Sequence, residues 1–232
     1  MTEQDRQEIL EKSKIFFREK IANNHKENVK KLKDLSCFNV NPFLHKYLAN
    51  FAFGEATPEN MAKALVYPRA IGTSIATTFG TQLQFYCNDV LSSFASTTSG
   101  IDIEFIDAVD GRRKYCQIKA GPNTINKDDV DTITRHFAGV RNIARTNHLD
   151  LRTEDCVVGV FYGTREEISS SYKKIDEVYP VLVGKEFWYR LTGEEDFYND
   201  LINAFAEVAD EVNGTEVINE AIRKVAESIS HQ

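Results

Sequence analysis

Residues that could carry chemistry gather around one short hairpin in the middle of the chain. Asp102 lies in Gly100-Ile101-Asp102, and Gln117 and Lys119 alternate in Gln117-Ile118-Lys119. A carboxylate, an amide oxygen and a main-chain carbonyl are the hard oxygen ligands that Mg²⁺ prefers. A lysine beside such an ion could orient a water molecule and stabilise charge developing on phosphorus. The pattern therefore indicates metal-assisted chemistry on a phosphate ester. The alternative is an ordinary sheet face with a cross-strand Asp–Lys pair.

The hairpin is expected from two alternating segments, 101–105 and 115–120, and from Asp110-Gly111 between them. Asp-Gly favours a two-residue turn because both positions tolerate positive φ. With those two residues at the turn, paired positions sum to 221. The apolar face then pairs Ile101 with Ala120, Ile103 with Ile118, and Phe105 with Cys116, and the polar face pairs Asp102 with Lys119 and Glu104 with Gln117.

The elements around the hairpin predict an α/β fold, because helices alternate with strands. Strands are expected at 157–162 and 181–183. Helices are expected over most of 3–35, from Pro58 to about 66 after an N-cap at Thr57, at 81–94, at 127–146 after an N-cap at Asn126, and beyond 197. A Gly/Thr-rich connector is expected at 69–80. We expect one domain over residues 1–232, with a helical N-terminal arm at 1–56, a core at 69–192 and C-terminal helices at 193–232.

Composition excludes several classes of protein. With 42% hydrophobic and 27% charged residues, the chain is neither disordered nor collagenous. The sequence has no apolar run of about 20 residues and no apolar signal core at its start, so we expect no membrane and a cytoplasmic location. The four cysteines form no CxxC pair, and we expect reduced core residues.

Charge is unevenly distributed along the chain. Residues 108–148 carry eight basic and four acidic side chains, a net charge of +4, whereas the whole chain has a net charge of −7. A basic middle could bind a polyanion locally. An uneven but merely solvated surface is the plainer interpretation of the charge alone.

Together with their flanks, these motifs resemble the PD-(D/E)xK nuclease superfamily, and within it the type II restriction endonucleases. The flanking segments that carry the resemblance are Gly72-Thr73-Ser74-Ile75 to Phe79-Gly80, Lys119 to Asn126, and Gly184-Lys185-Glu186-Phe187-Trp188. The resemblance covers roughly residues 69–192. It implies a restriction-endonuclease-like mixed β-sheet core flanked by helices, and Mg²⁺-dependent, site-specific hydrolysis of double-stranded DNA that leaves 5′-phosphates. In this interpretation Asp102 binds the metal with Gln117 and the Ile118 carbonyl, and Lys119 assists the attacking water.

One position departs from the superfamily pattern. The acidic residue of (D/E)xK is Gln117 here, and an amide supplies an oxygen ligand without negative charge. Glu104, opposite Gln117 in the expected register, could restore that charge as a further metal ligand, and Glu55 and Glu59 are weaker candidates. The departure keeps two alternatives open: another nuclease of the superfamily, non-specific, repair or modification-dependent, or a catalytically inactive DNA-binding protein.

The helix at 127–146 and the loop before it could supply the contacts to DNA. The residues concerned are Asn123, Asn126, Lys127, Arg135, Arg141 and Arg145. A helix N-terminus binds phosphate, and arginine reads guanine edges in the major groove. The plain alternative for each arginine is a solvated helix face. A palindromic target would require a two-fold homodimer, for which the N-terminal and C-terminal helices are candidate surfaces.

Overall fold

The computed structural model describes residues 2–231, except for the side chains of Ser74, Gln84 and Ser93. Contacts between residues divide the chain into two compact units. The sheet unit comprises residues 1–14 and 83–204, and the helical unit comprises residues 15–82 and 205–232. The division falls inside three helices: α1 (Glu3–Phe16), α5 (Ser74–Asp89) and α9 (Phe197–Glu211). These units do not test whether the chain folds as one domain, so the predicted boundaries stay a prediction.

The sheet unit contains four strands in the order β1-β2-β3-β4. They are β1 (Ile103–Ile106), β2 (Arg113–Lys119), β3 (Cys156–Val160) and β4 (Val181–Val183). The β1–β2 pair is antiparallel, and β2–β3 and β3–β4 are parallel. Strands β3 and β4 are buried throughout, as expected for parallel strands covered on both faces. The predicted fold class, a mixed sheet flanked by helices, is confirmed.

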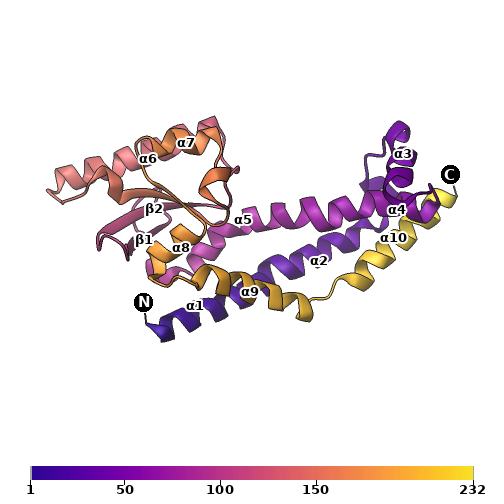
Figure 1. Cartoon of the computed structure of the whole chain (residues 1–232), viewed down its shortest axis with the longest axis horizontal. Helices are drawn as coiled ribbons and strands as arrows, with labels where there is room; N and C mark the ends of the chain where they lie inside the picture. The colour runs from indigo at the N-terminus through magenta and orange to yellow at the C-terminus, as the bar shows by residue number, and fades with distance from the viewer. Residues whose placement is uncertain (1, 232) are drawn as a thin grey trace. The chain divides into compact units, whose positions relative to one another are not determined.

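Helices cover both faces of this sheet (Figure 1). On one face lie α6 (Lys127–Thr146) and α7 (Ser170–Asp176), whose buried side chains pack against Val158 and Val160 of β3. On the other lies α8 (Lys185–Thr192), whose Phe187 ring approaches Gly159 so closely that an added Cβ would meet it at 2.4 Å. Three 3-10 turns complete the unit: η5 (Ser92–Phe94), η6 (Thr153–Asp155) and η7 (Arg165–Glu167).

Helix α6 begins where the sequence predicts. The Asn126 side chain accepts hydrogen bonds from the Asp128 and Asp129 N–H groups, at 2.8 and 3.0 Å. The Asp129 carboxylate in turn accepts from the Asn126 N–H at 2.9 Å, which completes a capping box. Its buried stripe, Val130, Ile133, Phe137, Val140 and Ala144, is the one that the periodicity predicts.

The helical unit is built around α4 (Pro58–Tyr67) and α10 (Thr215–Ser230). Val29, Leu32, Ala62, Val66, Ala221, Ile222 and Val225 form its buried core. The other elements are η1 (Phe17–Ala22), α2 (Asn23–Lys30), η2 (Lys31–Lys33), η3 (Leu35–Cys37), α3 (Pro42–Phe53) and η4 (Pro68–Thr73). The predicted N-cap of α4 is confirmed, because the Thr57 hydroxyl accepts from the Asn60 N–H at 3.2 Å.

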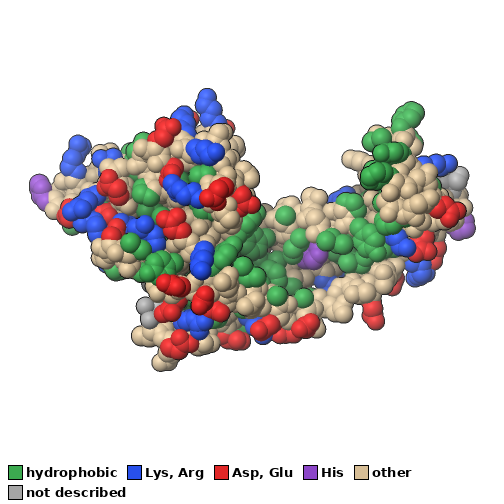
Figure 2. Space-filling view, viewed as in Figure 1, with side chains coloured by type: hydrophobic (Ala, Val, Ile, Leu, Met, Phe, Trp, Pro, Cys, Tyr) green, Lys and Arg blue, Asp and Glu red, His purple; other side chains and the backbone are tan. Residues whose placement is uncertain are grey.

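Helix α3 presents an exposed apolar face (Figure 2). Phe43, Tyr47 and Phe51 follow one another at four-residue spacing and are 90%, 58% and 77% exposed. Leu44 and Leu48 lie beside them and are 50% and 45% exposed. The opposite side of α3 is buried at His45 and Ala49. This helix lies within the predicted helical arm at 1–56, although the sequence pattern did not single it out as a separate helix.

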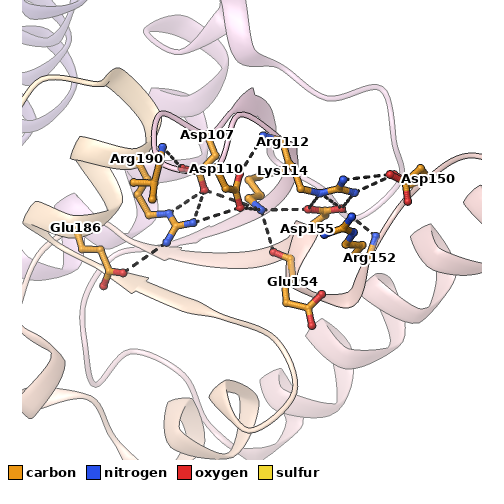
Figure 3. Close-up of polar contacts among 11 residues, drawn as sticks. Asp107, Asp110, Arg112, Lys114, Asp150, Arg152, Glu154, Asp155, Glu186 and Arg190 are labelled. Carbon is orange, nitrogen blue, oxygen red and sulfur yellow. Dashed lines mark hydrogen bonds and ion pairs between the residues drawn. The ribbon is translucent and has the colours of Figure 1, made fainter.

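A network of buried charges lies at the start of β2 (Figure 3). The Lys114 side chain is 1% exposed, and its ammonium lies 2.7 Å from an Asp110 carboxylate oxygen and 3.1 Å from one of Asp155. Arg112 holds the other side of Asp155 at 2.6 Å. Arg190 of α8 holds the fully buried Asp107 at 2.6 Å. The network ties the hairpin loop to η6 and α8.

The predicted hairpin register is wrong by two residues. Ile103 pairs with Cys116, so paired positions sum to 219 rather than 221. The loop is longer than expected: the Gly111 N–H donates to the Asp107 carbonyl and the Asp107 N–H to the Arg112 carbonyl, both at 2.9 Å. A type I′ turn requires positive φ at both central residues, and of the pair only Gly111 has it, at 68°.

Two further predictions are corrected. Residues 69–80 are not a connector but belong to η4 and α5. The Thr77 hydroxyl donates to the Thr73 carbonyl one turn back at 2.9 Å, and Thr81 does the same to Thr77 at 3.1 Å, so these side chains do not compete with the helix. Cys37 is exposed rather than in the core, whereas the other three cysteines are buried.

In residues 2–231 no helix is both long and apolar enough to cross a membrane.

Candidate active site

The site is built on the end of β2 where β1 has not yet begun. The Asp102 N–H donates to the Cys116 carbonyl at 3.0 Å, although Cys116 is already the register partner of Ile103. Two residues thus face one, as in a β-bulge, a feature that re-aims a side chain. The Asp102 carboxylate accepts from the Ile118 N–H at 2.7 Å, in the place of a strand carbonyl. The predicted register placed Asp102 directly opposite Lys119. The structure does not, because Asp102 lies in this bulge.

Burial raises the pKa of the Asp102 carboxyl above its ordinary value. The Ile118 N–H and the positive charge of Lys119 offset part of that rise. The structure thus brings Asp102 within electrostatic reach of Lys119. A buried carboxylate is costly to ionise, and a cation beside it stabilises its ionised form. A bound metal ion would act on Asp102 in this way.

Gln117 lies against α6 rather than in solvent. Its side chain is 6% exposed, and its amide nitrogen lies 2.6 Å from Nδ1 of His136. The same nitrogen donates to the Gly100 carbonyl. Gly100 has φ of 78°, and a Cβ there would lie 2.5 Å from Cγ of His136, so only glycine fits. The glycine of the Gly-x-Asp motif thus makes room for the histidine.

Lys119 closes the constellation at the last position of β2. Its carbonyl accepts from the Phe161 N–H at 2.8 Å, which fixes the backbone there. Within the described part of the chain, its half-buried side chain has no hydrogen-bond or ion-pair partner. The ammonium is therefore available for a substrate or a water molecule.

Glu104 is occupied elsewhere. It is level with Tyr115 rather than Gln117. Its carboxylate accepts from the hydroxyls of Ser96 and Thr98, at 2.6 and 3.2 Å, and from Arg113 at 3.1 Å. The structure therefore does not bring Glu104 to Gln117, and its role as a metal ligand stays a prediction.

The predicted DNA-contacting residues all belong to α6 or the loop before it, and all are exposed: Asn123, Asn126, Lys127, Arg135, Arg141 and Arg145. Asn126 is engaged in the helix cap. Arg135 donates to the Thr132 hydroxyl at 3.3 Å. Arg141 and Arg145 line a shallow hollow with Leu149 and Leu151. One helix thus carries His136 toward Gln117 and arginines toward solvent.

His136 is the residue that sequence reasoning missed. It is not among the residues of this helix that the sequence pattern selects. A signal was present, because it lies three residues after Ile133 and four before Val140, and this spacing puts it at the border of the buried face. The pairing with Gln117 depends on tertiary structure and has no sequence signature.

The donors of the site fit a magnesium ion of the kind that keeps several waters. Among the described residues, no three His, Cys, Asp or Glu side chains cluster as metal ligands. Mg²⁺ is, however, commonly held by one or two carboxylates together with substrate phosphates. The Asp102 carboxylate, the Gln117 amide oxygen and the Ile118 carbonyl are oxygen donors of this class.

Comparison with known proteins identifies the family. No curated protein sequence matches the chain. The profile of a family described as type II restriction endonuclease EcoO109I matches residues 11–213, which include the whole hairpin, α6 and α8. The match extends well beyond the motif into both units. The chain therefore belongs to the EcoO109I family of type II restriction endonucleases.

Proposed function

We propose that this nuclease cleaves double-stranded DNA at a specific sequence, with Mg²⁺ bound at Asp102, and leaves 5′-phosphates. The observation that carries the proposal is the gathering of Asp102, Gln117 and Lys119 at one end of the β1–β2 pair. Family membership supports the reaction class. The oxygen donor set supports the metal.

Each residue has a separate task in this proposal. Asp102 supplies the negative ligand, held in place by the Ile118 N–H at 2.7 Å. Gln117 and the Ile118 carbonyl supply neutral oxygen ligands. Lys119, with its free ammonium, orients the attacking water and stabilises the charge that develops on the phosphate oxygens. When bound, Mg²⁺ would lower the pKa of water and polarise the phosphate.

The DNA contacts in this proposal come from α6. Lys127 and the loop residue Asn123 lie near the helix N-terminus, where backbone N–H groups favour phosphate. Arg141 and Arg145 lie on exposed turns further along. Phosphate contacts position the duplex and base contacts specify the sequence. We expect both kinds from this helix.

Digestion of a plasmid with the purified protein and Mg²⁺ tests the proposal. Discrete fragments with 5′-phosphate ends are the expected result. A smear, or cutting only of methylated DNA, would indicate a non-specific or modification-dependent nuclease instead. Binding without cutting would indicate an inactive DNA-binding protein. Asp102→Ala and Lys119→Ala should each lose about 10²-fold or more in rate, whereas Lys174→Ala, at an exposed lysine of α7, should cut normally.

We also propose that the enzyme acts as a two-fold homodimer that pairs through α3. The exposed stripe is symmetric about Tyr47, with Phe43 four residues before it and Phe51 four after. Antiparallel packing of two copies would place Phe43 against Phe51 of the other copy. A fully exposed aromatic side chain offers about 150–250 Å², and Phe43, Tyr47 and Phe51 are 90%, 58% and 77% exposed, so together they offer roughly 450 Å². That is about half of what one partner buries in a standard interface. The helix has one charged residue, Lys46, so repulsion is small.

Cysteine crosslinking tests this pairing directly. In a Cys37→Ser background, which removes the exposed native thiol, Tyr47→Cys should form a disulfide with itself across the axis. Phe43→Cys should crosslink only when mixed with Phe51→Cys. A monomer by sedimentation, or a dimer that Phe43→Glu and Phe51→Glu do not disrupt, would place the interface elsewhere or remove it.

A further inference from the structure

We infer that His136 is a positioning residue: together with the Gly100 carbonyl it fixes the orientation of the Gln117 amide, so that the amide oxygen is presented as a metal ligand. The inference deepens the proposed function and rests on its metal site. Nothing in the superfamily motif includes a histidine from the following helix. The argument comes from the hydrogen bonds around one buried amide.

The hydrogen bonds define which way the amide faces. A side-chain amide has two N–H donors on its nitrogen and only acceptors on its oxygen. The Gly100 carbonyl is an acceptor, so the group that faces it must be the Gln117 nitrogen. The second N–H points to Nδ1 of His136 at 2.6 Å. Both donors are used and Nδ1 acts as an acceptor. Among the groups that the structure describes, none donates to the side-chain amide oxygen of Gln117.

Rigid neighbours hold this arrangement. His136 is flanked on α6 by Phe137, which is fully buried, and Ile133 of the same helix is 1% exposed. The ring also lies in direct contact with the Gly100 backbone, where no side chain could fit. Gln117 itself is 6% exposed. The amide therefore cannot turn without leaving two buried hydrogen-bonding groups unsatisfied, which is unfavourable.

The arrangement also explains why this position holds an amide rather than the usual carboxylate. A carboxylate has no donor and would face two acceptors, the Gly100 carbonyl and Nδ1 of His136. Gln117→Glu is therefore not a simple gain of a better ligand, as chemistry of the ligand alone would suggest. Gln117 and His136 thus form a matched pair: the amide donates and Nδ1 of the histidine accepts. A carboxylate at position 117 would need a donor in the place where Nδ1 lies.

Binding of Mn²⁺ to the protein without DNA, measured by electron paramagnetic resonance, tests the inference independently of cleavage. His136→Leu removes the acceptor, and we expect about tenfold weaker binding or more, as for other residues that orient metal ligands. His136→Asn places an oxygen where Nδ1 lies and should bind within about threefold of the wild type. Thr134→Leu, at an exposed position of the same helix, is the matched control. Circular dichroism reports folding, and His136→Ala replaces the leucine variant if that variant unfolds.

A double-variant cycle separates positioning from a general structural effect. If His136 acts only through Gln117, the variant with both His136→Leu and Gln117→Leu should bind Mn²⁺ no more weakly than Gln117→Leu alone. Additive losses, unchanged binding by His136→Leu, or failure of His136→Asn to restore binding would overturn the inference. If the Mn²⁺ results overturn the inference but the wild-type protein still cuts plasmid DNA at specific sites, the proposed function stands. If the Mn²⁺ results are as expected but the wild-type protein does not cut DNA, the inference stands and the proposed function does not.

Discussion

Replacing Lys114 by methionine should strongly destabilise the sheet unit. The Lys114 side chain is 1% exposed, and its ammonium contacts Asp110 at 2.7 Å, Asp155 at 3.1 Å and the Glu154 carbonyl at 3.4 Å. Methionine fills the same volume but removes the charge. It leaves Asp155, which is 2% exposed, without one of its partners (Figure 3).

The size of the effect follows from what remains. Breaking a buried ion pair by removing one partner costs about 3–5 kcal/mol, because a buried charge is left uncompensated. Here Arg112 still holds Asp155 at 2.6 Å and Arg190 still holds Asp107 at 2.6 Å. We therefore expect the lower end, about 3 kcal/mol. That is a large part of the roughly 5–15 kcal/mol of a typical domain.

Urea unfolding followed by fluorescence of Trp188 measures this change. Trp188 is the single tryptophan and is fully buried in the sheet unit, so its signal reports on that unit. Lys174→Met, at an exposed lysine of α7, is the matched control and should change stability by less than about 0.5 kcal/mol. A Lys114→Met protein within about 0.5 kcal/mol of the wild type, at the same denaturant slope, would refute the reasoning.

The pH dependence gives an independent check. Burial raises the pKa of the Asp155 carboxyl, but hydrogen bonds from Arg112, the Arg152 N–H and Lys114 outweigh it and hold that pKa well below its ordinary value of 3.8. A depressed pKa contributes stability that is present above the unfolded value and lost as pH falls through the folded one. The wild type should lose stability below about pH 4. The Lys114→Met protein should lose less over that range.

Three further predictions concern the site. Asp102→Asn should raise the melting temperature in calorimetry, because burial raises the pKa of that carboxyl and the amide removes the cost of ionising it, while plasmid cleavage falls about 10²-fold or more. Gly100→Ala should lower the free energy of unfolding by more than about 2 kcal/mol, because a positive φ and contact with His136 act together. Gly111→Ala, also at positive φ but in open space, should lower it by about 1 kcal/mol. Equal losses in thermal unfolding would contradict this. Arg141→Ala should weaken DNA binding in anisotropy titrations and lower the salt slope by about 1 if it contacts phosphate; unchanged affinity and slope would place the contact elsewhere.

Local signals explain the parts of the fold that the sequence predicts well. Helix α6 has a capping residue at Asn126, acidic residues in its first turn and a long apolar stripe, so every signal agrees on residues 127–146. The prediction of a connector at 69–80 was wrong because glycine and threonine favour loops only on average. There, threonine hydroxyls bond within the helix, and no local signal distinguishes that choice.

The hairpin shows where sequence patterns lose their power. Strand alternation has a period of two, so a slip of two residues leaves every side chain on its face and changes only its partner. The predicted faces therefore survive: Ile103, Phe105 and Cys116 are buried together. The turn decides the register, and this turn is closed by Asp107 in its buried charge network rather than by the Asp-Gly pair alone.

The site adds a limit of a different kind. Asp102, Gln117 and Lys119 can be selected from the sequence because their types suit phosphate chemistry. What each side chain can do depends on neighbours from elsewhere in the chain. The orientation of an amide, for example, is set by the acceptors that face its nitrogen. For Gln117 those acceptors are a backbone carbonyl and a histidine from α6. A substitution at a motif position is therefore understood only together with the second side chain that makes it fit, and the cycle of Gln117 with His136 measures that dependence.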